Sequence, residues 1–111
     1  MAELTRRFTE ALNARDLDTL RALATNDIEF RKAQGGKALR GDDGVKSLIA
    51  AAADADLRLI REGEERVEEN GRVTVPVRVM IGQDDLGGTA VFEVRDGKIA
   101  AFEVITELVR S

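Results

Sequence analysis

Residues 8 to 30 of this chain read FTEALNARDLDTLRALATNDIEF and contain two helix patterns followed by a strand pattern. Leu4, Phe8 and the apolar residues after them recur at helical spacing, which predicts an amphipathic helix over the first thirteen residues. Asp16 precedes a second apolar stripe and is expected to cap that helix, because its carboxylate can accept a free amide of the first turn. Ile28 and Phe30 alternate with charged residues, which predicts a short strand.

A third helix and a run of strands follow this segment. The glycine-bounded residues 41–44 are expected to deliver an aspartate cap to a helix with apolar positions from Val45 to Ala53. Alternating patterns then predict antiparallel strands over residues 57–69, 72–82, 89–95 and 98–108. Helices followed by a meander predict one α+β domain over residues 1–111, with three helices packed on one face of a curved sheet.

The turns between the strands predict how the strands pair. Asn70-Gly71 is best closed by a three-residue loop with Gly71 in the left-handed conformation. This register pairs Val67 with Val73, Leu59 with Ile81, Glu68 with Arg72 and Glu62 with Arg78. Pro76 has no amide hydrogen and is expected beside an edge or a bulge. Residues 83–88, rich in glycine, predict a mobile loop, whereas Asp96-Gly97 predicts a tight turn.

The composition excludes much of common enzymology. The chain has no cysteine, histidine, tryptophan or tyrosine, which removes disulfides, thiol nucleophiles, imidazole bases and the usual zinc and haem ligands. We therefore expect no metal and no cofactor. Seventeen basic residues against twenty-one acidic ones give a net charge of -4, which argues against nucleic-acid binding. No apolar run approaches the ~20 residues of a membrane span and no signal peptide is evident, so a soluble cytoplasmic protein without membrane contact is expected.

Three segments resemble the nuclear transport factor 2-like superfamily, in particular its SnoaL-like branch. They are the stretch from Phe8 to Phe30, the sequence LRGDDGV from Leu39 to Val45, and the sequence FEVRDGKIAAFEV from Phe92 to Val104. The resemblance implies a cone, in which a curved mixed sheet wraps around three N-terminal helices and leaves an apolar cavity. Enzymes of this superfamily use the cavity for ketosteroid isomerisation, epoxide hydrolysis, polyketide cyclisation or dehydration.

The resemblance also identifies functional groups that this chain lacks. Phe8 stands where ketosteroid isomerases carry the oxyanion-hole tyrosine, Lys32 where they carry the general-base aspartate, and Ala90 where they carry a second, protonated aspartate. Without those groups neither proton transfer nor enolate stabilisation of that kind is available. The acid-base residues of polyketide cyclases and epoxide hydrolases have no clean counterpart either. Whether the chain is an enzyme therefore stays open.

The family alignment and the strand alternation direct all four phenylalanines inward, so they are expected to cluster in an apolar pocket. The candidate pocket residues are Phe8, Phe30, Lys32, Val75, Val77, Val79, Ala90, Phe92, Phe102, Val104 and Thr106. Small alanines on the last two strands leave volume for a ligand, but the side chains alternatively fill the cone themselves. Lys32 either pairs with an acidic ligand at the mouth or extends into solvent. Arg61 and Glu65 either form a polar rim or are solvated.

Two functions from different classes follow. In the first, the chain binds a small hydrophobic or amphipathic molecule in the cone, without isomerase-type chemistry. In the second, it is a non-catalytic dimeric scaffold or protein-interaction module with a filled cone, and an engineered scaffold of this fold is a further alternative. Under either hypothesis we expect a homodimer through the outer sheet face, which carries Thr74, Met80, Val91, Arg78 and Glu93.

Overall fold

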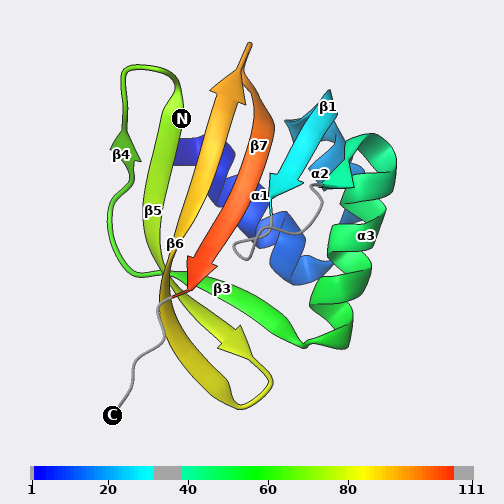
Figure 1. Ribbon diagram of the computed structural model, residues 1–111, viewed down its shortest axis with the longest axis vertical. Coiled ribbons are helices and arrows are strands. Elements are labelled where there is room, and N and C mark those ends of the chain that lie inside the picture. Colours follow the sequence, from blue (N-terminus) through cyan, green and yellow to red (C-terminus); the bar gives the residue numbers. More distant parts are fainter. Residues whose placement is uncertain (1, 32–38, 107–111) are drawn as a thin grey trace.

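The computed structural model describes residues 2–31 and 39–106. Three helices come early in the chain: α1 (Ala2–Ala14), α2 (Leu17–Leu23) and α3 (Gly41–Asp54). Seven strands complete the described part: β1 (Ala24–Arg31), β2 (Leu39–Arg40), β3 (Leu57–Arg61), β4 (Arg66–Val67), β5 (Arg72–Ile81), β6 (Asp84–Arg95) and β7 (Lys98–Thr106) (Figure 1). The expected order of helices and strands is confirmed.

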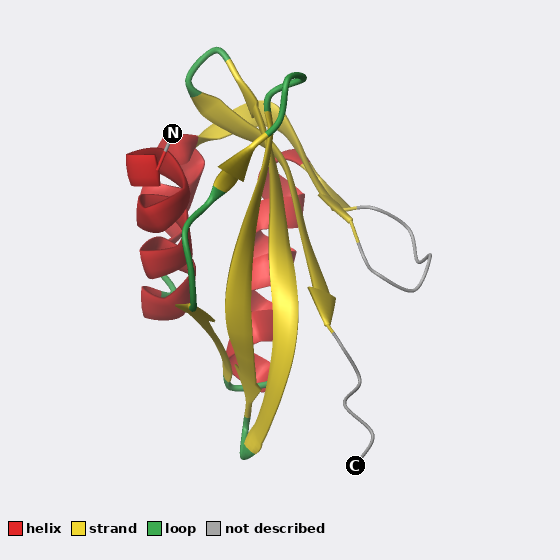
Figure 2. Cartoon of the chain, turned by 90° about the vertical axis from the view of Figure 1, so that its left-hand side faces the viewer, coloured by secondary structure: helices red, strands yellow, loops and turns green. Residues whose placement is uncertain are grey.

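All seven strands belong to one mixed sheet. Its order is β2-β1-β7-β6-β5-β3, with β4 also paired to β5. β1 runs parallel to β7, whereas the other neighbouring strands are antiparallel. The helices lie together on one side of this sheet, and the sheet does not close on itself (Figures 1 and 2). The α+β class and the wrapped mixed sheet are therefore confirmed.

The helix starts were predicted with mixed success. Asp16 caps α2 as expected, because its side chain accepts hydrogen bonds from the Thr19 amide at 3.2 Å and the Thr19 hydroxyl at 2.6 Å. The expected aspartate cap of α3 is wrong, since Arg40 is the N-cap residue and makes no side-chain cap hydrogen bond. Asp42 lies inside the first turn of α3, where its carboxylate is bound by Arg21.

The predicted continuous strand over residues 57–69 is wrong. β3 ends at Arg61 and β4 begins at Arg66, and the register changes across this break, so that Leu59 pairs with Val79 instead of Ile81. The break lies opposite Pro76, which has no amide hydrogen for a ladder bond but accepts one from the Glu62 amide at 2.9 Å. The chain bulges where the proline cannot donate.

The tight turns follow their glycines. Val67 pairs with Val73 across a three-residue loop in which Gly71 has a φ of +80°, as predicted. Asp96 and Gly97 both have positive φ and close the β6–β7 hairpin in two residues. The predicted loop over residues 83–88 is wrong, because Gly82 with a φ of +59° closes a two-residue turn and β6 already begins at Asp84.

Polar side chains at the end of α1 and directly after it form hydrogen bonds with the free edge of β3. The Asn13 amide donates to the Leu59 carbonyl and accepts from the Leu59 amide, both at 2.9 Å. Arg15 donates to the carbonyls of Leu57 at 2.7 Å and Ala52 at 3.0 Å. These contacts replace the strand neighbour that β3 lacks on this side and fix α1 against the sheet.

Candidate functional site

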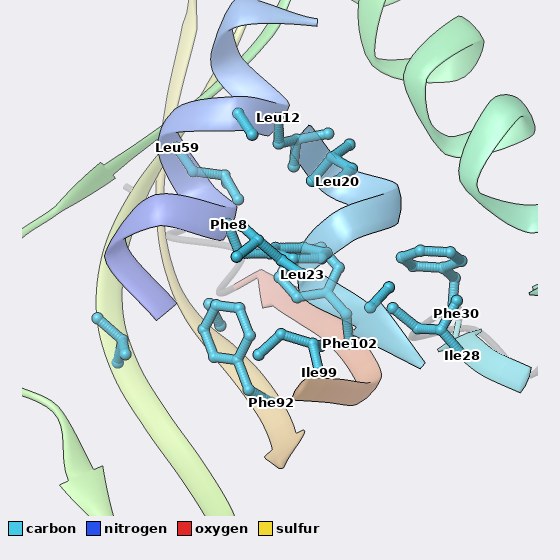
Figure 3. Close-up of a cluster of buried hydrophobic side chains, with 14 of the residues drawn as sticks. Phe8, Leu12, Leu20, Leu23, Ile28, Phe30, Leu59, Phe92, Ile99 and Phe102 are labelled. Carbon is cyan, nitrogen blue, oxygen red and sulfur yellow. The ribbon is translucent and has the colours of Figure 1, made fainter. Parts of the chain in front are cut away.

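The four phenylalanines form one cluster inside the sheet, as expected. The ring centroids of Phe8 and Phe92 lie 5.8 Å apart in an edge-on arrangement, and each lies 5.1 Å from the Phe102 ring. Phe30 reaches the same cluster through Phe102, at 6.3 Å. Figure 3 shows this contact among neighbouring aliphatic side chains. Phe8 and Phe92 are completely buried, so the interior around these two rings is filled by the protein's own side chains.

Other candidate pocket residues belong to the same packed core. Val75, Val77, Val79 and Ala90 are each exposed by 2% or less. Phe8 and Ala90 occupy the positions at which the resemblance to ketosteroid isomerases places a hydroxyl and a carboxyl group. Because both side chains are apolar and buried, neither position offers a hydrogen-bond donor or a proton carrier.

A hollow of about 290 Å³, open to solvent on one side, lies between α3 and the ends of β1 and β7. Its apolar walls are formed by Phe30, Leu39, Leu48, Ala51, Leu57, Phe102 and Val104. Three of these residues, Phe30, Phe102 and Val104, are among the predicted pocket residues. The hollow therefore lies beside the phenylalanine cluster and not within it.

The remaining predicted residues are placed elsewhere or lie outside the described part. Thr106 is exposed at the end of β7. Lys32, expected at the mouth of the pocket, lies outside the described residues. The helical wall was missed, although Leu48 was recognised as an apolar position of the third helix and Ala51 lies three residues later on the same face. That spacing was the available signal for it.

Two charged residues border the hollow, Arg31 and Glu103. Strand alternation turns both side chains to the outer face, because their neighbours Phe30 and Phe102 are buried on the inner face. On the outer face Arg31 donates to the Glu29 carboxylate at 3.1 Å and to the Glu93 carboxylate. The hydrogen bonds that Arg31 donates to these carboxylates, first of all to Glu29, raise the pKa of Arg31. The walls of the hollow thus contain no inward-facing charge among the described residues.

A separate polar cluster lies near the N-terminal end of α1, at Thr5. The Thr5 hydroxyl donates to the Glu65 carboxylate at 3.1 Å, and the Arg61 guanidinium donates to the Thr5 hydroxyl at 3.4 Å. Arg61 and Glu65 are half-buried, while Thr5 is fully buried. These contacts hold the bulged segment between β3 and β4 against α1, away from the hollow.

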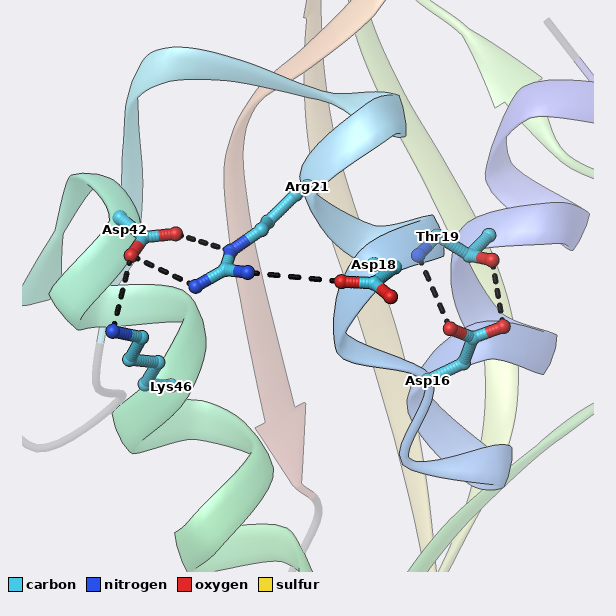
Figure 4. Close-up of polar contacts among 6 residues, drawn as sticks. All are labelled: Asp16, Asp18, Thr19, Arg21, Asp42 and Lys46. Atoms are coloured by element: carbon cyan, nitrogen blue, oxygen red, sulfur yellow. Dashed lines mark hydrogen bonds and ion pairs between the residues drawn. The ribbon is translucent and has the colours of Figure 1, made fainter.

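An ion-pair network joins α2 to α3 on the surface (Figure 4). Arg21 binds Asp42 with two nitrogens and approaches Asp18 at 3.7 Å, while Lys46 lies 3.4 Å from Asp42. The hydrogen bond from Arg21 lowers the pKa of Asp42. The hydrogen bonds from Thr19 lower the pKa of Asp16 in the same way. This network is exposed and holds the two helices together, and it has no access to the hollow.

The outer face of the sheet combines apolar and ionic side chains. Thr74 pairs with Val91, which is 5% exposed, and Ile105 beside Thr89 is 40% exposed. Around them Arg78 pairs with Glu62 at 3.6 Å and with Asp85 at 3.1 Å. The predicted Glu62–Arg78 ion pair is therefore confirmed, and so is the pair between Glu68 and Arg72 at 3.8 Å.

Comparison with known proteins identifies the family. Residues 5–102 match the sequence profile of the SnoaL-like domain, so the chain belongs to that family. No curated protein matches the chain. None of the helices in the described ranges is long and apolar enough to cross a membrane, and no group of three or more acidic residues there could hold a metal ion.

Solved structures share the architecture over nearly the whole chain. The putative ketosteroid isomerase of Kribbella flavida DSM 17836 has a TM-score of 0.82 at 20% identity, covering 99% of this chain and 79% of that one. The putative polyketide cyclase of Sinorhizobium meliloti has a TM-score of 0.78 at 20% identity, covering 94% of each chain. An NTF2-like protein of unknown function from Burkholderia pseudomallei K96243 has a TM-score of 0.76 at 24% identity, covering 95% of this chain and 88% of that one. At these identities the likeness establishes the fold alone.

Proposed function

We propose that this SnoaL-like protein binds a small hydrophobic or amphipathic molecule in the hollow between α3, β1 and β7, and releases it chemically unchanged. The observation that carries the proposal is the hollow of about 290 Å³ with seven apolar side chains in its walls. Small-molecule sites are concave and lined mainly by apolar side chains, and the lining of this hollow has that composition.

Binding without chemistry is supported by the walls themselves. Among the described residues, no acid, base or nucleophile points into the hollow, and the family positions at Phe8 and Ala90 are apolar and buried. General acid-base catalysis needs a titratable group within hydrogen-bond reach of the reacting atoms. The names of the solved relatives include an isomerase and a cyclase, but the proposal for this chain does not extend to those reactions.

The test is a substitution that fills the hollow without disturbing the core. Ala51 lines the hollow and is exposed on α3, so Ala51→Phe places a ring at the mouth of the space. Ala50→Phe is the matched control, because Ala50 is an exposed neighbour on the same helix and does not line the hollow. Phe92→Arg is a poor test, since Phe92 is completely buried and the variant would unfold.

The measurement is isothermal titration with a panel of ring compounds and fatty acids, supported by thermal shift. We expect at least one compound to bind the parent and Ala50→Phe equally, and to bind Ala51→Phe at least tenfold more weakly. Chromatography of the recovered compound should show it unchanged. If no compound distinguishes Ala51→Phe from Ala50→Phe, the hollow is not a binding site and the scaffold alternative gains support.

A further inference from the structure

We infer that Asn70 is a site of spontaneous covalent modification, at which the Gly71 nitrogen displaces the side-chain amide and solvent water converts residue 70 to aspartate and isoaspartate. Asn70 and Gly71 lie in the tight turn between β4 and β5, at the top of Figure 1. The inference is independent of the hollow and of any ligand. It follows from the hydrogen bonds of the turn, from its exposure and from the residue that comes after each asparagine of the chain.

The reaction needs only this turn and water. The Gly71 nitrogen loses its proton to solvent and forms a bond to Cγ of Asn70. The bond from Cγ to Nδ2 then breaks, and Nδ2 gains a proton and leaves as ammonia. Water next opens the resulting cyclic imide: cleavage of the bond between Cγ and the Gly71 nitrogen gives aspartate, and cleavage at the main-chain carbonyl of residue 70 gives isoaspartate. No oxidant or reductant is required.

Two hydrogen bonds of the turn favour the attack. The Arg72 amide donates to Oδ1 of Asn70 at 3.2 Å. This bond closes a ring that contains the Gly71 nitrogen, and its donor faces the oxygen on which negative charge develops when that nitrogen attacks Cγ. The Gly71 amide donates to the Glu68 carbonyl at 3.3 Å, which is longer than an ordinary N–H···O bond. The Gly71 proton is therefore weakly held, and Cγ is polarised for attack.

Asn70 differs from the two other asparagines of the chain, Asn13 and Asn26. Asn70 is exposed, and Gly71 has no Cβ to hinder the approach of its nitrogen. Asn26 is also exposed but precedes Asp27, whose side chain stands beside the attacking nitrogen. Asn13 is half-buried, and its side chain is bound to β3 by two hydrogen bonds of 2.9 Å. Asn70 should therefore react first.

The two products should differ in their effect on the fold. Aspartate keeps the length of the main chain, whereas isoaspartate adds one carbon atom to it. The turn is held at both ends, because Val67 pairs with Val73 and the Val94 amide donates to the Gly71 carbonyl at 3.0 Å. The isoaspartate form should lose the hydrogen bond from Val94, and its melting temperature should fall by about 4 °C.

The experiment incubates the folded parent chain at pH 7 and at pH 9 and follows each asparagine by peptide mass spectrometry. We expect the Asn70 peptide to exchange ammonia for water on the order of tenfold faster than the Asn26 peptide, because Gly71 leaves the attacking nitrogen unhindered. The reaction should be faster at pH 9, since the nitrogen must lose its proton. Asn70→Ser is the matched control: it has no leaving amide and should keep its mass and its melting temperature.

Conversion at Asn70 that yields isoaspartate, with a fall in melting temperature for the parent but not for Asn70→Ser, supports the inference. If the Asn70 peptide keeps its mass, or if Asn26 reacts equally fast, Asn70 is not a favoured site and the inference is wrong. Asn70→Asp serves as the standard with an unchanged main chain. If the isolated isoaspartate form melts at the same temperature as Asn70→Asp, the modification site is supported and the expected loss of the Val94 hydrogen bond is wrong.

Discussion

Asn13 joins α1 to the sheet through the backbone of one residue, Leu59. Its side-chain amide forms two hydrogen bonds of 2.9 Å with Leu59, one to the carbonyl and one from the amide. Leu59 is 2% exposed and lies on β3, which ends the sheet on this side. Asn13→Leu has a side chain of similar volume and cannot form either bond, so it leaves one backbone donor and one acceptor without these partners.

The expected loss of stability follows from the two bonds. Each is worth roughly 0.5–1.5 kcal/mol net, and a poorly hydrated backbone group left without a partner costs about 1–3 kcal/mol. Because Asn13 is half-buried, water reaches part of the site, and we expect the free energy of unfolding to fall by about 2–3 kcal/mol. At about 4 °C per kcal/mol for a chain of this size, the melting temperature should fall by about 8–12 °C.

Urea denaturation followed by far-ultraviolet circular dichroism measures this loss, since the chain has no tryptophan or tyrosine for intrinsic fluorescence. Glu10→Leu is the control, because Glu10 lies on the exposed side of α1 and the same new side chain there removes no hydrogen bond to the sheet. A loss below about 0.5 kcal/mol for Asn13→Leu, or an equal loss for Glu10→Leu, would refute the argument that Asn13 replaces the missing strand neighbour of β3.

Two further predictions concern pH and assembly. Hydrogen bonds lower the pKa of Asp42 from its ordinary value of 3.8, so the stability that it contributes is present above that value and is lost as the pH falls through the lower folded pKa. The melting temperature should therefore fall less between pH 7 and pH 2 for Asp42→Asn than for Asp43→Asn, because the Asp43 carboxylate makes no ion pair with the described residues. An equal fall in melting temperature for the two variants would contradict this. For assembly, we expect a homodimer through the outer sheet face in sedimentation velocity at micromolar concentration, and Ile105→Arg should shift it to monomer because Ile105 is 40% exposed on that face. A monomeric parent protein would refute the dimer.

Local signals in the sequence predicted the features that depend on neighbouring residues. Asp16 caps α2 because its carboxylate needs only the amide three residues later. Asp96-Gly97 closes a hairpin because both residues adopt positive φ. The inward direction of Phe30, Phe92 and Phe102 follows from strand alternation and that of Phe8 from helical spacing, and both signals are equally local.

Features that depend on a distant partner were not predictable in this way. The break between β3 and β4 is caused by Pro76 on the facing strand, whose missing amide removes a ladder bond and changes the register of Leu59. The start of β6 at Asp84 was missed for a different reason, because Gly82, the last residue of the predicted strand 72–82, adopts a positive φ and already turns the chain. In the first case the residue that decides the structure lies outside the segment whose pattern was interpreted, whereas in the second it lies directly beside it.

The candidate site shows the same limit. Helical spacing directs Phe8 inward and strand alternation directs Phe102 inward, yet Phe8 is packed in the core whereas Phe102 also borders the hollow. Whether an inward side chain meets another side chain or empty space depends on what faces it across the interior. The facing element here is α3, whose distance from the sheet no strand pattern reveals.

The small side chains of α3 explain why the protein is filled around Phe8 and Phe92 but leaves a hollow beside α3. Four consecutive alanines occupy residues 50–53 of this helix, and the exposed Ala51 lines the hollow together with Phe102 and Val104. Filling an apolar space commonly stabilises a protein, and natural sequences rarely use every such gain. Ala51→Phe should consequently melt at a temperature equal to or higher than the parent while it loses the ligand. A variant that loses both stability and ligand would instead indicate that α3 already packs as closely as the sheet allows.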